Sequence, residues 1–186
     1  MAQKGQRKTL RVKALKNSGK TLDQAGLEKL ALRYVERYAT TQQKLARYLS
    51  RKVRERGWHG QEAPEIERLV ESYSEMGYID DALFAQNKAT SLMQRGYGSR
   101  RVSQALYQAG ISEEDSQSAR KFSQEQKWAA AEKFARKRSI GPFALEQSPP
   151  EKCKKQLQAF LRAGHDFDLA RRFVFAQPGE NIDQDE

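Results

Sequence analysis

Apolar residues recur along the chain at spacings of three and four positions, which is the period of an α-helix. In the first such segment, Leu27, Leu30 and Tyr34 lie on one helical face. No run of alternating β-branched residues is long enough to indicate a sheet. Long stretches are rich in Ala, Leu, Gln, Glu, Lys and Arg, which favour helix. The pattern therefore predicts an all-α protein.

Start and stop signals divide this pattern into nine helical segments. Thr21 and Thr40 each precede a glutamine by three residues, which is the capping-box pattern. Asp80 is predicted to cap the fourth segment, with Ile79 and Phe84 in the spacing of a hydrophobic staple. Serines at 99, 112 and 148 are predicted to cap the fifth, sixth and eighth.

The same arrangement of helix stop and start signals recurs along the chain with a period near 50 residues. Leu106 and Gly110 are four positions apart, as are Phe160 and Gly164, and a short polar-capped helix follows each glycine. Such a repeat is typical of stacked helical units whose individual cores are small. We predict an elongated tandem array of three three-helix, helix-turn-helix-like modules, divided as follows: basic arm 1–21, module one 22–77, module two 78–122, module three 123–177 and acidic tail 178–186.

The net charge of +10 and the isoelectric point of about 9.7 predict an anionic partner: nucleic acid, a nucleoprotein surface or a membrane. The first twenty residues hold seven bases and no acids, whereas the last eight hold four acids and no bases. Without these ends, residues 21–178 still carry +7. The positive charge therefore belongs to the folded modules as well as to the arm.

Basic residues gather on helical faces in each predicted module. In the second helical segment, Lys44, Arg47 and Arg51 lie opposite Leu45 and Leu49. One such cluster is explained equally well by solvation, but its recurrence in three modules favours a surface that contacts phosphates. The candidate contact residues are Lys44, Arg47, Arg51, Arg54, Lys88, Arg95, Arg100, Arg101, Arg136, Lys137, Arg138, Arg162, Arg171 and Arg172.

Most aromatic residues fall on apolar stripes and are predicted to lie in the core. Trp58 and Tyr97 differ, because each lies in a glycine-flanked loop beside arginines. Stacking on bases and packing back onto the core are both open for these two. The predicted core aromatics are Tyr34, Tyr38, Tyr48, Phe84, Trp128, Phe134, Phe160, Phe167 and Phe173.

Patterns that would indicate catalysis are weak. Residues 14–21 resemble a phosphate-binding P-loop, but that loop needs a parallel sheet, which the pattern does not predict, so a nucleotide hydrolase is the least favoured alternative. His59 and His165 lack metal-motif spacing, and His165 is expected to be a cation at a helix end. Cys153 has no cysteine partner. We predict a protein that is not an enzyme and needs no metal or cofactor.

No apolar run has membrane-spanning or signal-peptide length, so we expect a cytoplasmic location.

The middle of the chain resembles the central signature of the RecX family, and the resemblance extends over roughly residues 25–176. Segments 40–45 and 164–170 resemble the first and last modules of that family. The residues that carry the central signature are Gly77, Tyr78, Asp80, Asp81, Phe84, Gly98 and Gly110.

This resemblance implies a regulator that binds the filament of the RecA recombinase on DNA and inhibits ATP hydrolysis, strand exchange and co-protease activity. Its implied context is DNA repair, recombination and the SOS response. The implied partners are the recombinase filament and the single-stranded DNA within it, and we expect a monomer. The alternative is a helical module that binds DNA or RNA directly, without a recombinase partner, and affinity for naked DNA separates the two.

Overall fold

The computed structural model describes residues 21–183, so the predicted basic arm, the P-loop-like segment before Thr21 and the last three residues of the acidic tail lie outside it. The described residues form helices, with an isolated bridge between Leu22 and Trp58 in place of any strand, and the all-α prediction is confirmed. The helices are α1 (Gln24–Arg37), α2 (Gln42–Arg56), α3 (Ile66–Glu75), α4 (Asp81–Gln94), α5 (Ser99–Ala109), α6 (Glu113–Glu125), α7 (Lys127–Lys137), the 3-10 helix η1 (Gly141–Phe143), α8 (Pro150–Ala163) and α9 (Phe167–Phe175).

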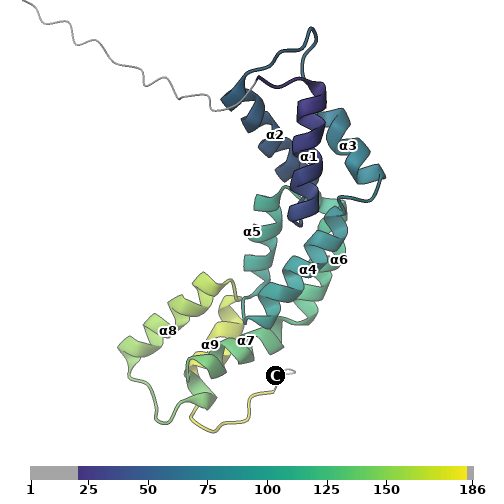
Figure 1. Ribbon diagram of the computed structural model, residues 1–186. Helices are drawn as coiled ribbons and strands as arrows, with labels where there is room; N and C mark the ends of the chain where they lie inside the picture. The colour runs from purple at the N-terminus through teal and green to yellow at the C-terminus, as the bar shows by residue number, and fades with distance from the viewer. Residues whose placement is uncertain (1–20, 184–186) are drawn as a thin grey trace, which may run out of the picture.

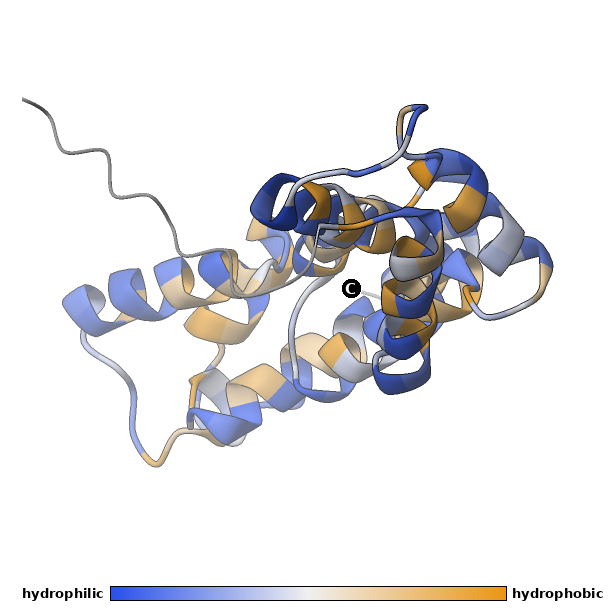
Figure 2. Cartoon of the chain, turned by 45° about the horizontal axis from the view of Figure 1, so that its top comes forward, coloured by the Kyte–Doolittle hydropathy of each residue, from blue (hydrophilic) through white to orange (hydrophobic). Residues whose placement is uncertain are grey.

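The helices form an elongated, curved array, as predicted (Figure 1). Three hydrophobic clusters follow one another along it, within residues 22–79, 85–130 and 131–174. Apolar residues turn toward neighbouring helices and hydrophilic ones turn outward (Figure 2). The predicted boundary at residue 122 falls inside α6, and α7 supplies Ala130 to the second cluster and Ala131 to the third. Modules two and three therefore share a helix at their junction.

Asp80 and Ser112 cap their helices as predicted, but α1, α2 and α8 begin later than expected and α5 begins one residue earlier. Asp80 accepts a hydrogen bond from the Leu83 amide (2.7 Å), and Ser112 accepts one from the Asp115 amide (3.0 Å). The cap of α1 is Asp23 rather than Thr21. The reason lies before the helix, where Leu22 is buried and bonded in extended form to the loop after α2.

Three other predicted caps are wrong by one residue, and at α2 and α5 the observed cap residue is held by a contact with another module. Thr41 replaces Thr40 at α2, and Gly98 replaces Ser99 at α5. Pro149 replaces Ser148 at α8, where the Ser148 hydroxyl accepts a hydrogen bond from Gln156 instead.

The junction between modules one and two joins the start of α2 to the end of α5. The Thr41 hydroxyl is fully buried and donates a hydrogen bond to the Ala109 carbonyl (2.7 Å). The Gln42 amide donates to the Asp81 carboxylate (3.0 Å). Gly110, which ends α5 in the left-handed conformation (φ 75°), lies so close to Gln43 that a Cβ there would clash.

The junction between modules two and three repeats this arrangement with different atoms. The Gly98 amide donates to the Ala163 carbonyl (3.0 Å), and the Arg100 amide donates to the Gly164 carbonyl (3.1 Å). A Cβ at Gly98 would lie 2.2 Å from the Gly164 carbonyl oxygen. In both junctions, the amino end of one second helix meets the carboxyl end of the next. Helices α2, α5 and α8 therefore follow one another along the inner side of the curve (Figure 1).

His165 lies inside the second junction, 1% exposed, and not on the surface as a cation. Its Nε2 lies 3.0 Å from the Gly96 carbonyl oxygen, which only accepts, so Nε2 carries the proton. Nδ1 is buried without a partner. Burial lowers the pKa of His165, although the bond to Gly96 and the nearby Asp166 act in the opposite direction. Burial thus opposes the positive charge expected of His165, because module two covers the helix end that it follows.

The aromatic residues divide between core and surface. Phe160 and Phe173 are fully buried, as predicted, but Tyr38 is 49% exposed and Phe167 is 46% exposed. Trp58 packs against the first cluster and its ring nitrogen donates to the Glu62 carbonyl (2.6 Å). Tyr97 packs against both the second and the third clusters. Both loop aromatics therefore pack onto the core.

We predict that Gly98→Ala destabilises the protein by roughly 1–3 kcal/mol, since the added methyl group must displace backbone at the second junction. Urea unfolding followed by circular dichroism measures the change. Gly77→Ala is the matched control: no atom lies within 4 Å of its Cβ, although its positive φ of 77° carries a cost of about 1 kcal/mol. A smaller loss for Gly98→Ala than for Gly77→Ala would contradict the close junction.

We predict that stability falls as the pH drops below 6.5, the ordinary histidine pKa, because the unfolded chain then binds a proton that folded His165 resists. His165→Gln keeps a donor for Gly96 but does not titrate, so its unfolding free energy should change less between pH 7 and pH 5. Parallel denaturant titrations at these pH values measure the difference. An equal change in unfolding free energy between pH 7 and pH 5 for the two proteins would show that His165 does not cause the pH dependence.

Candidate functional site

A basic pocket of about 460 Å³ lies where α2, α4 and α5 meet. Four of the predicted contact residues line it: Lys44, Lys88, Arg95 and Arg101. None of the residues that line it is acidic, and the remaining lining residues are Leu92, Tyr97, Gln104, Ala105, Gln108 and Ala109. Four cations and two side-chain amides, without a carboxylate, are suited to bind phosphate oxygens.

Helical spacing and the first junction together build this pocket. Lys88 lies on α4, and Arg95, seven positions later, is the residue that ends that helix on the same face. Arg101 lies on the facing side of α5. Lys44 comes from module one, and the bonds from Thr41 and Gln42 to module two hold its helix end in place. The site is therefore shared between two modules.

Lys44 is held in a position that is unfavourable for its charge. Burial lowers its pKa, and the nearby Lys88 lowers it further, while Asp81 partly compensates. The Lys44 ammonium lies 4.2 Å from the centre of the Phe84 ring, which gives it a cation–π contact. An anion that entered the pocket would relieve the repulsion between the two lysines.

Asp81 stabilises the junction and does not act as a second cap. Its carboxylate accepts the Gln42 amide, and burial raises its pKa, with that hydrogen bond acting in the opposite direction. Asp80 is therefore the cap of α4, as predicted. Of the remaining signature residues, Phe84 lies against Lys44, Gly98 and Gly110 permit the close junctions, and Gly77 and the half-exposed Tyr78 form the turn before α4.

The basic face of α2 continues from the pocket along the first module. Arg47 donates to the Gln108 carbonyl of α5 (3.4 Å). Arg51 lies one turn further, 3.7 Å from Glu55 and 5.7 Å from the centre of the Tyr48 ring. Arg54 bonds back to the Ser50 carbonyl of its own helix.

Arg100 and Arg101 are neighbours in sequence but serve different sites. Arg101 lines the basic pocket, whereas Arg100 pairs with Asp166 (3.1 Å) at the second junction. The cavity at that junction, about 510 Å³, also contains Arg172 and the carboxylate of Asp168. Its mixed charge distinguishes it from the basic pocket.

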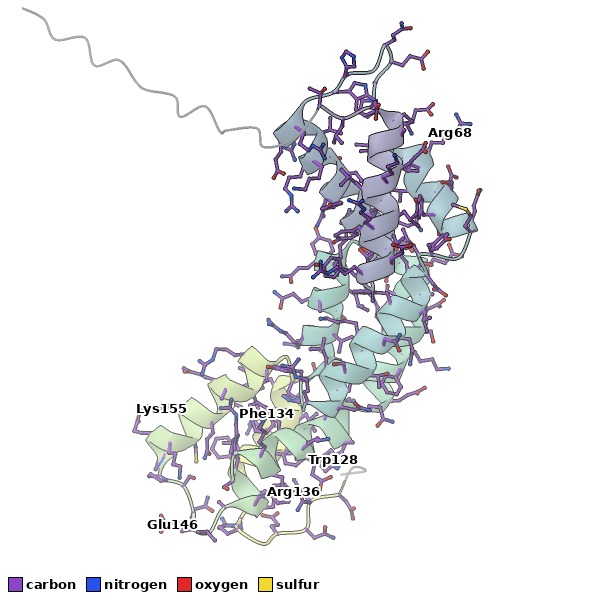
Figure 3. The ribbon with its side chains drawn as sticks, in the orientation of Figure 1. Arg68, Trp128, Phe134, Arg136, Glu146 and Lys155 are labelled. Carbon is purple, nitrogen blue, oxygen red and sulfur yellow. The ribbon has the colours of Figure 1, made fainter. Side chains whose placement is uncertain are left out.

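The predicted bases of module three are dispersed. Arg136 pairs with Glu132 (2.6 Å) and lies on α7, away from the basic pocket (Figure 3). Arg138, Arg171 and Arg172 each lie over an aromatic ring of their own module. Lys137 and Arg162 are exposed near helix ends. The structure therefore gathers four of the fourteen candidates at one place, and it adds Gln104 and Gln108, which the charge pattern did not single out.

Residues 21–183 contain no group of three or more His, Cys, Asp or Glu side chains that could hold a metal ion. Cys153 is buried in the third cluster. In the same part of the chain, no helix has the length and apolar character needed to cross a membrane.

We predict that Lys44→Gln leaves the thermal midpoint unchanged or raises it by about 1–2 °C at low salt, because it removes a desolvated cation beside Lys88. The difference should shrink as salt screens the repulsion. It should also shrink as the pH rises toward 10, since the lowered pKa of Lys44 makes wild-type stability increase there. Scanning calorimetry checks this, with exposed Lys29→Gln on α1 as the control. A lower thermal midpoint for Lys44→Gln than for wild type would contradict the inference that this position disfavours the charge of Lys44.

Comparison with known proteins agrees with this architecture. Residues 80–119 match the model of the family described as RecX, second three-helix domain. A regulatory protein RecX of Myxococcus xanthus is 34% identical over 163 residues, covering 82% of this chain and 86% of the relative. A regulatory protein RecX of Cronobacter sakazakii is 37% identical over 98 residues, covering 52% of this chain and 58% of the relative.

Two solved structures share the fold. A crystal structure of regulatory protein RecX superimposes with a TM-score of 0.58 at 21% identity, covering 78% of this chain and 68% of the other. The crystal structure of RecX from Lactobacillus salivarius gives a TM-score of 0.55 at 20% identity, covering 78% and 90%.

Proposed function

The chain belongs to the RecX family of regulatory proteins, and on that premise we propose that it binds the RecA–DNA filament and inhibits ATP hydrolysis, strand exchange and co-protease activity. In this proposal it acts as a cytoplasmic monomer in DNA repair, recombination and SOS control, with no chemistry of its own. The observation that carries the proposal is the basic pocket lined by Lys44, Lys88, Arg95 and Arg101.

The shape of the array supports a partner with repeating units. Helices α2, α5 and α8 follow one another along its inner side (Figure 1), and their 15, 11 and 14 residues give a contour on the order of 60 Å. A binding surface of that length reaches more than one subunit of a filament. A protein bound across subunits opposes the relative movements that a cycle of ATP hydrolysis requires. Inhibition then follows from binding alone.

The charge of the pocket supports a phosphate partner within that filament. Contacts from lysine and arginine to phosphates supply affinity that depends steeply on salt. The pocket lies where two modules meet, so the two modules must keep their relative position to offer all four cations together. We therefore propose that the first junction, and not one module alone, is the unit that recognises the filament.

We predict that Lys88→Glu/Arg101→Glu raises the concentration needed for half-inhibition of RecA ATP hydrolysis on single-stranded DNA by roughly tenfold or more, because two contacts become repulsive. Co-sedimentation with the filament should weaken in parallel. The matched control is Lys29→Glu/Arg68→Glu, which makes the same change of net charge on exposed residues of module one outside the pocket (Arg68 is labelled in Figure 3).

Two outcomes would overturn the proposal in different ways. A wild-type protein that leaves both hydrolysis and strand exchange unchanged would exclude the inhibitory function. Inhibition by Lys88→Glu/Arg101→Glu equal to wild type would exclude the pocket as the contact. Tight, sequence-selective binding to naked DNA would instead favour the direct-binding alternative.

A further inference from the structure

A second cationic cleft, of about 580 Å³, lies between α1 and α2 and is lined by tyrosines. We propose that this tyrosine cleft is a stacking site for the bases of single-stranded DNA. The proposal rests on the proposed function only in taking the filament as the source of the strand. The lining residues are Leu30, Arg33, Tyr34, Arg37, Tyr38, Tyr48, Arg51 and Lys52.

Helical spacing puts these residues on two facing stripes. On α1 they occupy positions 30, 33, 34 and 37, which form one face, and Tyr38 follows as the residue that ends the helix. On α2 they occupy positions 48, 51 and 52. Such a stripe between packed helices ordinarily contains aliphatic residues. Here arginine and tyrosine replace them toward the open edge. The spacing predicted a core, whereas the structure shows a cleft that is only partly covered.

The tyrosines form a preorganised aromatic surface. The Tyr34 and Tyr48 rings stack with centres 4.3 Å apart and planes at 21°, and the Tyr38 ring lies 5.2 Å from that of Tyr34. Tyr38 is 49% exposed, so part of this surface is open to solvent. A base that stacks on it meets rings already held by their neighbours. Stacking of this kind accepts any base, because every base has an aromatic face.

Cations surround this aromatic surface. Arg37 lies 5.5 Å from the centre of the Tyr38 ring, and Lys52 lies 5.9 Å from that of Tyr48. Glu55 pairs with Lys52 (2.7 Å) and Arg51 (3.7 Å) but does not line the cleft. The lining therefore offers stacking surfaces together with positive charge for the phosphates, which is the combination that single-strand binding proteins use.

The tyrosine cleft and the basic pocket both take residues from one face of α2. Lys44 in the pocket and Arg51 in the cleft are seven residues apart on α2 and share one face, with Arg47 between them. Seven residues of helix span about 10 Å. That distance is about three nucleotides at the 3.4 Å spacing of a stacked strand. One strand can thus place a base on the tyrosines and a phosphate in the pocket.

A purely structural role for the tyrosines makes a different prediction. Rings that only join α1 to α2 would affect stability but would not distinguish a strand with bases from one without them. An electrostatic surface without stacking would bind both strands equally. The decisive measurement is therefore the preference for bases at constant phosphate charge.

The experiment uses the full chain and two labelled strands, oligothymidine and an abasic strand, each of about 20 nucleotides, which exceeds the about 4–16 nucleotides of a typical single-strand site. Fluorescence anisotropy at one salt concentration gives both affinities. We expect wild type to prefer oligothymidine by roughly fivefold or more. Tyr38→Ser should remove that preference and leave abasic binding unchanged. Arg37→Gln should weaken both strands alike.

Tyr107→Ser is the matched control, because Tyr107 is a tyrosine on α5 that is 80% exposed and lies outside both cationic sites. Its preference for oligothymidine should equal that of wild type, and thermal unfolding should show that both serine variants are folded. Equal binding of the two strands by wild type, or an unchanged preference in Tyr38→Ser, would overturn the stacking site. A preference for oligouridine over oligothymidine of about tenfold or more would overturn DNA as its occupant.

The outcome is separable from that of the filament assay. A base preference that depends on Tyr38 supports the cleft even if RecA hydrolysis is not inhibited. Inhibition that depends on Lys88 and Arg101, without any base preference, supports the proposed function and removes the stacking site.

Discussion

The structure depends on the close end-to-end approach of its second helices. At both junctions the amino end of one helix meets the carboxyl end of the next. The Thr41 hydroxyl donates to the Ala109 carbonyl at the first junction, and the Gly98 and Arg100 amides donate to the Ala163 and Gly164 carbonyls at the second. This approach is possible only where side chains are absent, at Gly98 and Gly164 in one junction and at Gly110 in the other. Modules with small cores are thereby held in register by hydrogen bonds to the carbonyls at these helix ends.

The first junction also creates the basic pocket. Thr41 and Gln42 fix the start of α2 against module two, and Lys44, a few residues later, is carried into the pocket formed by α4 and α5. Burial at this point lowers the pKa of Lys44 and raises that of Asp81, because it disfavours the charged form of each group relative to water. The same contact that stabilises the array therefore places Lys44 close to Lys88 in a partly buried position.

The two cationic sites differ in what they offer a nucleic acid. The basic pocket presents charge and side-chain amides, which suit phosphates, while the tyrosine cleft adds flat aromatic surface, which suits bases. Their common element is α2, whose basic face runs from Lys44 to Arg51. The basic pocket takes its cations from two modules, so neither module would possess it alone.

The sequence by itself determined the helices, the three-module repeat and the excess positive charge, because these follow from spacing and composition. It also placed Asp80 correctly, since that cap is a local contact. Only the tertiary structure decided that Thr41 rather than Thr40 caps α2 and that His165 is buried. It also decided that Arg100 lies at the second junction while Arg101 lines the basic pocket. Each of these depends on a partner many residues away, which local periodicity does not encode. The tyrosines were assigned to the core for the same reason: helical spacing identifies a contact face, but only packing decides how much of it stays open.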